Sequence, residues 1–236
     1  MALRLLYPPR CLGCGEQVDS DFGLCGPCWR DTPFIGGTVC DACGTPLPGE
    51  ADGFRLECDD CMGRPRPWAQ GRAALQYDSG ARKLVLALKH GDRQDIARPA
   101  AKWMARAGTP LLRPEMLVAP VPLHWSRLLR RRYNQAALLS AALAGQVERA
   151  HCPDLLVRHR RTVALDHKSP DQRFAELAES ISVHPRRGHL LAGRPILLVD
   201  DVMTSGATFS ACAEACLAAG SGDVFVLALA RVAKGH

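Results

Sequence analysis

The pattern of apolar and polar positions predicts strands alternating with helices over most of the chain after residue 70. The clearest strand covers residues 196–199, four consecutive apolar residues of the kind buried on both faces inside a parallel sheet. An alanine-rich segment, residues 207–219, follows it and has the length of a helix. Shorter apolar runs predict further strands at 73–77, 117–124, 155–158, 181–183 and 223–231, and helices at 81–89, 96–107 and 134–149. This alternation predicts an α/β domain with a parallel sheet flanked by helices.

The residues after the strand at 196–199 carry the most specific chemistry. Asp200 and Asp201 stand where that strand is expected to leave the sheet, and small residues lead from there into the predicted helix: Thr204, Ser205, Gly206, Ala207 and Thr208. Ligands of open α/β sheets bind at the carboxyl ends of strands, and a helix N-terminus offers free N–H groups to an anion. Paired acids before such a loop indicate a ligand with both a phosphate and vicinal hydroxyl groups, as in a ribose phosphate. A buried strand that ends in a solvated acidic turn is the plainer alternative.

Residues 196–208 resemble the phosphoribosyl-pyrophosphate (PRPP) motif of the type I phosphoribosyltransferases: an apolar strand, two acids, two residues, then Thr-Ser-Gly-Ala-Thr. The resemblance implies that Asp200 and Asp201 hold the ribose 2′- and 3′-hydroxyl groups, and that residues 204–208 surround the 5′-phosphate. It also implies Mg²⁺, bound together with PRPP.

The length of the chain and its cysteines limit the domain content and the cellular location that we expect. A chain of 236 residues accommodates one α/β domain of ordinary size and a small module. No segment has the uninterrupted apolar length of a transmembrane helix, and the first nine residues are too short an apolar run for a signal peptide. We therefore expect a cytoplasmic protein with reduced thiols. Its cysteines are then better interpreted as metal ligands than as members of disulfides.

Eight of the eleven cysteines form four Cys-x-x-Cys pairs: Cys11 and Cys14, Cys25 and Cys28, Cys40 and Cys43, Cys58 and Cys61. Two such pairs complete a closed Cys₄ zinc site, which is normally structural. The first and third pairs are each followed by glycine, at Gly15 and Gly44, which suits a tight turn with positive φ. This repeat favours two sequential sites, one in each half, although an interleaved pairing stays open. Cys212 and Cys216, one helical turn apart, are expected in the core.

The cysteine segment resembles a double zinc ribbon with two structural Zn²⁺ ions. Because it has few large apolar residues, we expect its folding to depend on metal. A redox or iron–sulfur role is the alternative. Residues 63–67 are predicted to be a stiff linker, so that residues 1–66 form the double zinc ribbon and residues 67–236 the phosphoribosyltransferase-like domain.

Charge is divided unevenly along the chain. Residues 1–70 hold 6 Lys and Arg against 10 Asp and Glu, whereas residues 71–236 hold 24 against 14. The phosphate motif therefore lies in the basic part, whose positive field favours PRPP, pyrophosphate or nucleic acid without choosing among them.

Basic side chains cluster after the predicted strand at 117–124. Arg127, the run Arg130, Arg131 and Arg132, and Gln135 offer donors to a polyphosphate or a nucleic-acid backbone, although a solvated basic helix face is an alternative. The polar stretch between 158 and 181 stands where type I phosphoribosyltransferases have a mobile lid, and an ordinary surface loop is equally consistent with it. The candidate pyrophosphate and lid residues are Lys89, Arg127, Arg132, Lys168 and Arg173.

Taken in order, these motifs resemble the ComF (competence protein F) family over nearly the whole chain. The resemblance rests on the four cysteine pairs, residues 89–91, 120–124 and 132–135, and the PRPP-type motif. It implies a cytoplasmic protein linked to the uptake of single-stranded DNA in competent bacteria. Two residues in the predicted lid differ from those usual in the family. Leu165 stands where members usually carry glutamine, and Glu176 where they usually carry asparagine.

Two functions are consistent with these observations. The first is a transferase that binds PRPP at residues 200–208 and transfers phosphoribose to an acceptor that no residue identifies. The second is a DNA-uptake factor without catalysis that binds single-stranded DNA, works with other DNA-uptake proteins and uses PRPP or a nucleotide as ligand. Stacking on single strands requires aromatic side chains, and only Trp125 and Tyr133 lie near the basic run.

Overall fold

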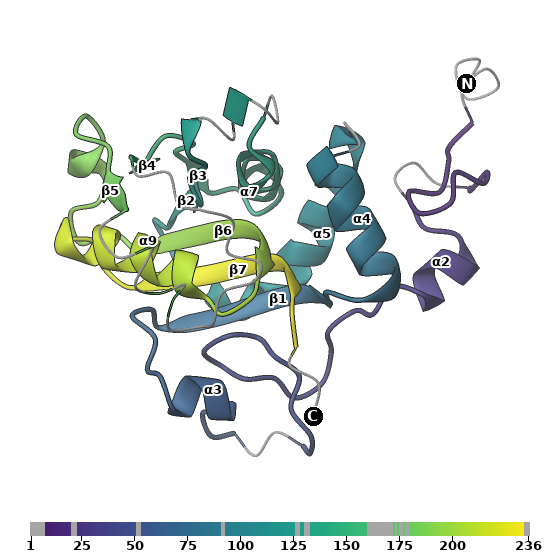
Figure 1. The fold of residues 1–236 in the computed structure, drawn as a ribbon, viewed down its shortest axis with the longest axis horizontal. Coiled ribbons are helices and arrows are strands. Elements are labelled where there is room, and N and C mark those ends of the chain that lie inside the picture. Colours follow the sequence, from purple (N-terminus) through teal and green to yellow (C-terminus); the bar gives the residue numbers. More distant parts are fainter. Residues whose placement is uncertain are drawn as a thin grey trace.

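The centre of the protein is a five-stranded parallel sheet in the order β1, β7, β6, β2, β3 (Figure 1). The strands are β1 (Gln70–Gln76), β2 (Leu117–Pro120), β3 (Ala150–His151), β6 (Ile196–Met203) and β7 (Val224–Arg231). The computed structural model describes residues 8–19, 23–50, 53–90, 93–125, 128, 129, 133–159, 172, 174, 177 and 180–233.

The central strands are buried on both faces, as the apolar run at 196–199 predicts. All eight residues of β7 are buried, and β6 is registered on both neighbours, with Leu198 opposite Ala119 and Val226. Alternate residues of each strand enter two separate cores, one on each face of the sheet. The expected parallel α/β architecture is therefore confirmed.

Helices cover both faces of the sheet. One face carries α4 (Ser79–His90), α5 (Ala97–Ala107) and α7 (Gln135–Gln146), whose apolar side chains join the core that includes Leu197. The other face carries α9 (Ala207–Ala218), which packs with Leu198. The helices that follow β2 and β6 thus lie on opposite faces, and a ligand crevice is expected at the carboxyl ends of two such neighbouring strands.

Local sequence signals explain where several elements begin and end. The Asn134 side chain accepts a hydrogen bond from the N–H of Ala136 at 3.0 Å and so caps α7, which ends at Gln146, short of the predicted residue 149. The strand predicted at 73–77 covers Gln70–Gln76 instead. Short 3₁₀ turns stand at Gln94–Ile96, where a helix beginning at 96 was predicted, and at Thr109–Leu111 and Gly188–Leu190.

Two of the predicted strands form a separate sheet. β4 (Leu156–Arg158) and β5 (Ile181–Val183) pair antiparallel with each other, with Val157 opposite Ser182. The pair packs over α9 through the core on that face.

The cysteine-rich segment lies against the sheet in two places (Figure 1). Its first half, with α2 (Gly26–Arg30), lies beside α4 and α5, where Phe34 stacks on Trp29 and meets Trp103 edge to face. Its second half, with α3 (Asp59–Met62), lies along β1. None of the helices in the described parts of the chain has the length and apolarity needed to span a bilayer.

Candidate phosphate and zinc sites

Two groups of four cysteines each gather their sulfur atoms within 4.8 Å of one another: Cys11, Cys14, Cys25 and Cys28, and Cys40, Cys43, Cys58 and Cys61. In the first group Cys14 and Cys25 have Sγ atoms 3.6 Å apart, and in the second Cys43 and Cys58 have Sγ atoms 3.7 Å apart. Four thiolates at the ordinary Zn–S distance of about 2.3 Å form a tetrahedron whose edges are about 3.8 Å. Both clusters therefore fit a closed structural zinc site, and the sequential pairing is confirmed over the interleaved one.

The two clusters are built alike. In each, a glycine after the second cysteine turns the chain, with φ of 81° at Gly15 and 73° at Gly44. The N–H of each glycine donates to the carbonyl oxygen of the first cysteine of its pair, at 2.9 and 2.8 Å. The predicted positive φ is thus confirmed at both positions, where a residue with a side chain would be strained.

The cysteines of the two clusters differ in their exposure to solvent. Cys40, Cys43 and Cys61 are at most 1% exposed and belong to the core that also contains strand residues of β2 and β6. Cys14 of the first cluster is exposed. The knuckle at Gly44 meets the backbone of Ala73 so closely that a Cβ there would lie 2.7 Å from its nitrogen. The second zinc ribbon is consequently part of the packing beneath the sheet.

Strand β6 continues through both acids to Met203, although the strand was expected to leave the sheet at Asp200. Asp200 lies opposite Ala228 of β7. The loop therefore begins after the acids, and their side chains alternate across the sheet.

The two acids have different surroundings. Burial and the neighbouring charge of Asp201 raise the pKa of Asp200 to about 8, against the opposing charges of Lys89 and Arg158. Asp201 is 7% exposed and forms an ion pair with Lys89, whose Nζ lies 3.2 Å from Oδ1. Lys89, a candidate from the sequence, is thus brought to the acids by the last turn of α4.

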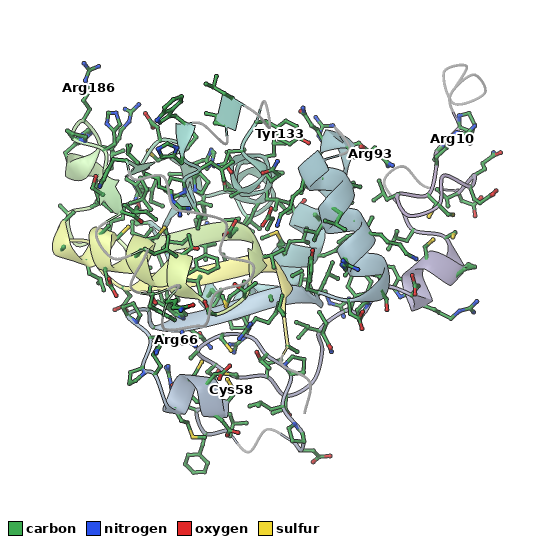
Figure 2. The ribbon with its side chains drawn as sticks, in the orientation of Figure 1. Arg10, Cys58, Arg66, Arg93, Tyr133 and Arg186 are labelled. Atoms are coloured by element: carbon green, nitrogen blue, oxygen red, sulfur yellow. The ribbon has the colours of Figure 1, made fainter. Side chains whose placement is uncertain are left out.

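The end of α4 is held by the segment that starts α7. The Tyr133 hydroxyl donates to the carbonyl oxygen of Leu88 at 2.7 Å, and the Gln135 amide lies 3.5 Å from that of Lys89. Asn134, between them, donates to the carbonyl of Val121 after β2 at 3.0 Å. These contacts fix the backbone that carries Lys89. Figure 2 shows Tyr133 between α7 and the end of α4.

The loop after β6 has the backbone of an anion site. Gly206 is left-handed, with φ of 82°, and α9 begins at the next residue. Two arginines hold the loop carbonyls: Arg66 donates to Ser205 at 2.9 Å, and Arg231 donates to Thr204 and, at 3.2 Å, to Met203. A trans peptide points its carbonyl and the next N–H in opposite directions, so the N–H groups of residues 204–206 face away from the arginines.

Those N–H groups are available to a ligand. Among the described residues, no backbone carbonyl accepts from the N–H of Thr204, Ser205 or Gly206. The first turn of α9 adds further N–H groups that a helix leaves without internal partners. Successive N–H groups around a left-handed residue form a concave site for an anion.

Sequence reasoning missed three arginines near the loop. Arg66 lies in the predicted linker, Arg231 is the last residue of β7 and is 4% exposed, and Arg158 of β4 is 6% exposed and acts on Asp200. For Arg158 and Arg231 the sequence offers one signal, namely an arginine within an apolar strand, because such a side chain is buried only when it has partners. The candidates that fall outside the described residues are Arg127, Arg132, Lys168 and Arg173, together with Arg130, Arg131, Leu165 and Glu176.

Comparison with known proteins places these features in a family. Residues 2–62 match the double zinc ribbon domain. The whole chain resembles DNA utilization protein YhgH of Salmonella typhimurium, with 30% identity over 96% of this chain and 99% of that protein. Competence protein F of Haemophilus influenzae is 27% identical over 94% of this chain and 96% of its own length. The protein belongs to the ComF family.

The alignments with these two relatives run nearly from end to end and so span both the cysteine-rich segment and the sheet of this chain. Among solved structures, glutamine PRPP amidotransferase from B. subtilis covers 61% of this chain at a TM-score of 0.41 and 13% identity. Adenine phosphoribosyltransferase from Thermoanaerobacter pseudethanolicus covers 61% at a TM-score of 0.37 and 15% identity.

Proposed function

We propose that this protein binds PRPP, or a closely related ribose phosphate, at the carboxyl end of β6. The loop of residues 204–208 takes the 5′-phosphate, and Asp200 and Asp201 take the ribose hydroxyl groups. The observation that carries the proposal is the orientation of the loop, whose carbonyls are held by Arg66 and Arg231 and whose N–H groups have no backbone acceptor in the described residues. Such a site recognises a phosphate by backbone geometry and needs no lysine in the loop.

The acids complete the recognition of a ribose. A carboxylate accepts hydrogen bonds from two vicinal hydroxyl groups. Mg²⁺ would enter bound to the diphosphate of PRPP, and the oxygens of Asp200 and Asp201 are the hard ligands it prefers. Lys89, paired with Asp201, offsets part of the charge that the two acids bring.

Transfer of the phosphoribosyl group is a further step of the same proposal. The bond between ribose C1 and the pyrophosphate oxygen breaks, a bond from C1 to the acceptor forms, and pyrophosphate leaves with the electron pair. Basic side chains stabilise that leaving group, and the candidates are Lys89, Arg127, Arg132, Lys168 and Arg173. The contribution of the protein is positioning and charge stabilisation.

A second candidate function is binding of single-stranded DNA with PRPP or a nucleotide as a ligand. It is favoured by the relatives named for DNA utilization and competence. Trp125, 63% exposed next to the basic run, is available for stacking on a base. This function would use partners in DNA uptake and would require no acceptor for phosphoribose.

The binding proposal is tested by titration calorimetry of PRPP with Mg²⁺ into the zinc-loaded, full-length protein. We expect Asp200→Asn combined with Asp201→Asn to lose binding, because each side chain exchanges one acceptor oxygen and its negative charge for an NH₂ donor. Asp223→Asn is the matched control, since Asp223 directly precedes β7 and so lies at the amino ends of the strands, away from the loop. Unchanged affinity in the double variant would refute the site.

Release of pyrophosphate separates the two functions. A panel of nucleobases and amines is offered with PRPP, and binding of a fluorescent single-stranded oligonucleotide is measured at rising salt. Release that depends on one acceptor supports transfer. Salt-sensitive DNA binding without release for any acceptor supports the second function.

A further inference from the structure

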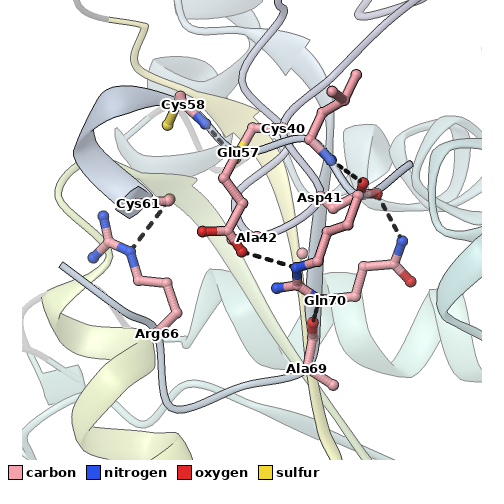
Figure 3. Close-up of polar contacts among 12 residues, drawn as sticks. Cys40, Asp41, Ala42, Glu57, Cys58, Cys61, Arg66, Ala69 and Gln70 are labelled. Carbon is pink, nitrogen blue, oxygen red and sulfur yellow. Dashed lines mark hydrogen bonds and ion pairs between the residues drawn. The ribbon is translucent and has the colours of Figure 1, made fainter. Parts of the chain in front are cut away.

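Arg66 joins the second zinc ribbon to the phosphate loop. Its Nε lies 3.4 Å from the Cys61 sulfur, and its Nη1 donates to the carbonyl oxygen of Ser205 at 2.9 Å. Figure 3 shows the side chain reaching from the chain after α3 to the sulfur of Cys61. Because the guanidinium is a rigid planar fork, the two contacts together fix the distance between a zinc ligand and the loop.

Arg231 makes a second connection of the same kind. Its Nη2 lies 3.7 Å from the Cys43 sulfur, while Nη1 donates to Met203 and Thr204 at the start of the loop. The side chain is 4% exposed, and its Nε has no hydrogen-bond partner among the described residues. A buried guanidinium that leaves one donor unused is held in place by the contacts that its other nitrogens make.

The charges of these groups are complementary. Four thiolates around one Zn²⁺ carry a net charge of about −2, and the two guanidinium groups supply +2. Hydrogen bonds from a cation to a metal-bound thiolate are stronger than those to a neutral thiol. Loss of the zinc would release the thiolates from their fixed positions and weaken the anchor of both arginines.

A packing contact adds a third connection. Trp68 donates through Nε1 to the carbonyl oxygen of Ala42, inside the second knuckle, at 2.6 Å. The far edge of its ring lies against Gly206, where a Cβ would come within 3.1 Å of Cη2. The left-handed residue of the loop therefore rests on a side chain that the ribbon itself orients.

We propose that Arg66 and Arg231 are positioning residues through which the second zinc site sets the geometry of the phosphate loop. The proposal rests on the proposed function of that loop, and it assigns the zinc of Cys40, Cys43, Cys58 and Cys61 a role in ligand affinity. The first ribbon has no such role: among the described residues its polar contacts outside the ribbon go to α4, as in the ion pair of Asp31 with Lys83, and to the backbone of β1, and none reaches the loop. Emptying the second site should release the loop, and emptying the first should not.

The test compares Arg66→Met and Arg66→Lys with Arg55→Met in the full-length, zinc-loaded protein. Arg55 lies in the same ribbon and donates hydrogen bonds to Glu57 and to the carbonyl oxygen of Ala69, and among the described residues it contacts neither a thiolate nor the loop. We expect Arg66→Met to weaken PRPP binding about 10- to 100-fold, the usual effect of losing a partner of a metal ligand. Arg66→Lys should stay weaker than the wild type because one ammonium cannot span both acceptors, and Arg55→Met should bind normally.

Two measurements report on the coupling without any ligand. Hydrogen exchange, followed by NMR, is measured at the Val232 and Ser210 amides, which donate to Met203 and Gly206 at 2.9 Å. Both should exchange faster in Arg66→Met. In protein loaded with Co²⁺, the ligand-field bands of the second site should change in Arg66→Met, and PRPP should shift them in the wild type alone.

The outcomes separate the two proposals. Unchanged amide exchange in Arg66→Met, or unchanged PRPP affinity, overturns the coupling. A wild type that binds no PRPP overturns the proposed function, while the amide exchange and the Co²⁺ bands still decide the coupling. A metal content of two ions per chain in each variant shows that the site itself is intact.

Discussion

Two neighbouring carboxyl groups at the end of β6 illustrate how one sequence motif produces two chemical environments. Asp201 is paired with Lys89 at 3.2 Å, whereas burial and the charge of Asp201 raise the pKa of Asp200 to about 8. Near neutral pH the unliganded site therefore carries Asp200 largely protonated. A ligand that needs its carboxylate must overcome this preference.

The raised pKa of Asp200 predicts a pH-dependent stability. Its native-state pKa, about 8, is above the unfolded value of about 3.9, so the stability it contributes is present below about pH 4 and is lost as pH rises to about 8. Asp200→Asn removes the ionisable group and should raise the thermal midpoint much more at pH 9 than at pH 5. Each kcal/mol corresponds to about 2–4 °C in a chain of this size. Equal midpoint changes at both pH values in calorimetric scans would contradict the shift.

Gly206 is predicted to be irreplaceable for two separable reasons. Ala at a left-handed position costs about 1–2 kcal/mol, and here its Cβ would also press on Trp68 at 3.1 Å. Gly220→Ala is the control, because φ there is 83° and no atom lies within 4 Å of the added Cβ. Both variants should lose stability in urea titrations, and only Gly206→Ala should lose PRPP affinity. Equal affinities would show that the loop tolerates the displacement.

At the scale of elements, the site is assembled by the ends of three segments that lie far apart in the chain. Helix α4 delivers Lys89, the start of α7 holds the end of α4, and β6 presents the acids. The positions of their ends, set by packing on one face of the sheet, decide whether Lys89 reaches Asp201.

Tyr133→Phe should loosen the end of α4. It removes the hydrogen bond to Leu88, worth about 1 kcal/mol, and frees the backbone that carries Lys89. Because the two residues act through one structure, Tyr133→Phe and Lys89→Met should be non-additive by at least about 0.5 kcal/mol in a double-mutant cycle on PRPP binding. Strictly additive effects would mean that Tyr133 supports only the fold.

At the scale of the whole molecule, the two zinc ribbons are alike in local geometry and unlike in position. The second has three cysteines in the core beneath β1, whereas the first lies beside α4, places Leu12 in the other core and leaves Cys14 exposed. Among the described residues, only the second has cysteines in contact with arginines that hold the loop.

Zinc release should therefore occur in two steps. A chromogenic chelator should take the ion of the first cluster rapidly, because Cys14 is exposed, and that of the second slowly, because Cys40 and Cys43 are at most 1% exposed. The midpoint of thermal unfolding should fall mainly with the second step, since that ribbon shares the core of the sheet domain. A single release phase for both ions would contradict this order. Cys14→Ser, which opens the first cluster alone, identifies the fast phase.

Much of this architecture follows from local patterns. Continuous apolar runs predicted β6 and β7. The glycines after Cys14 and Cys43 predicted the tight turns in the two Cys-x-x-Cys-Gly segments. The cysteine spacing predicted sequential zinc sites. Cys212 and Cys216 lie in the core as expected. These features depend on residues close together in the sequence, whose geometry the backbone limits strongly.

The sequence by itself thus determined the parallel α/β sheet, the two Cys₄ sites and the small-residue loop that leads into α9. Only the tertiary structure decided that β6 runs on through both acids, that Lys89 pairs with Asp201, and that β4 and β5 leave the main sheet. It also decided that a residue expected in a stiff linker, Arg66, bonds Ser205, which stands 139 positions further along the chain. The physical reason is that such contacts depend on how whole elements pack, and no local spacing encodes which distant carbonyl a long, flexible side chain will meet.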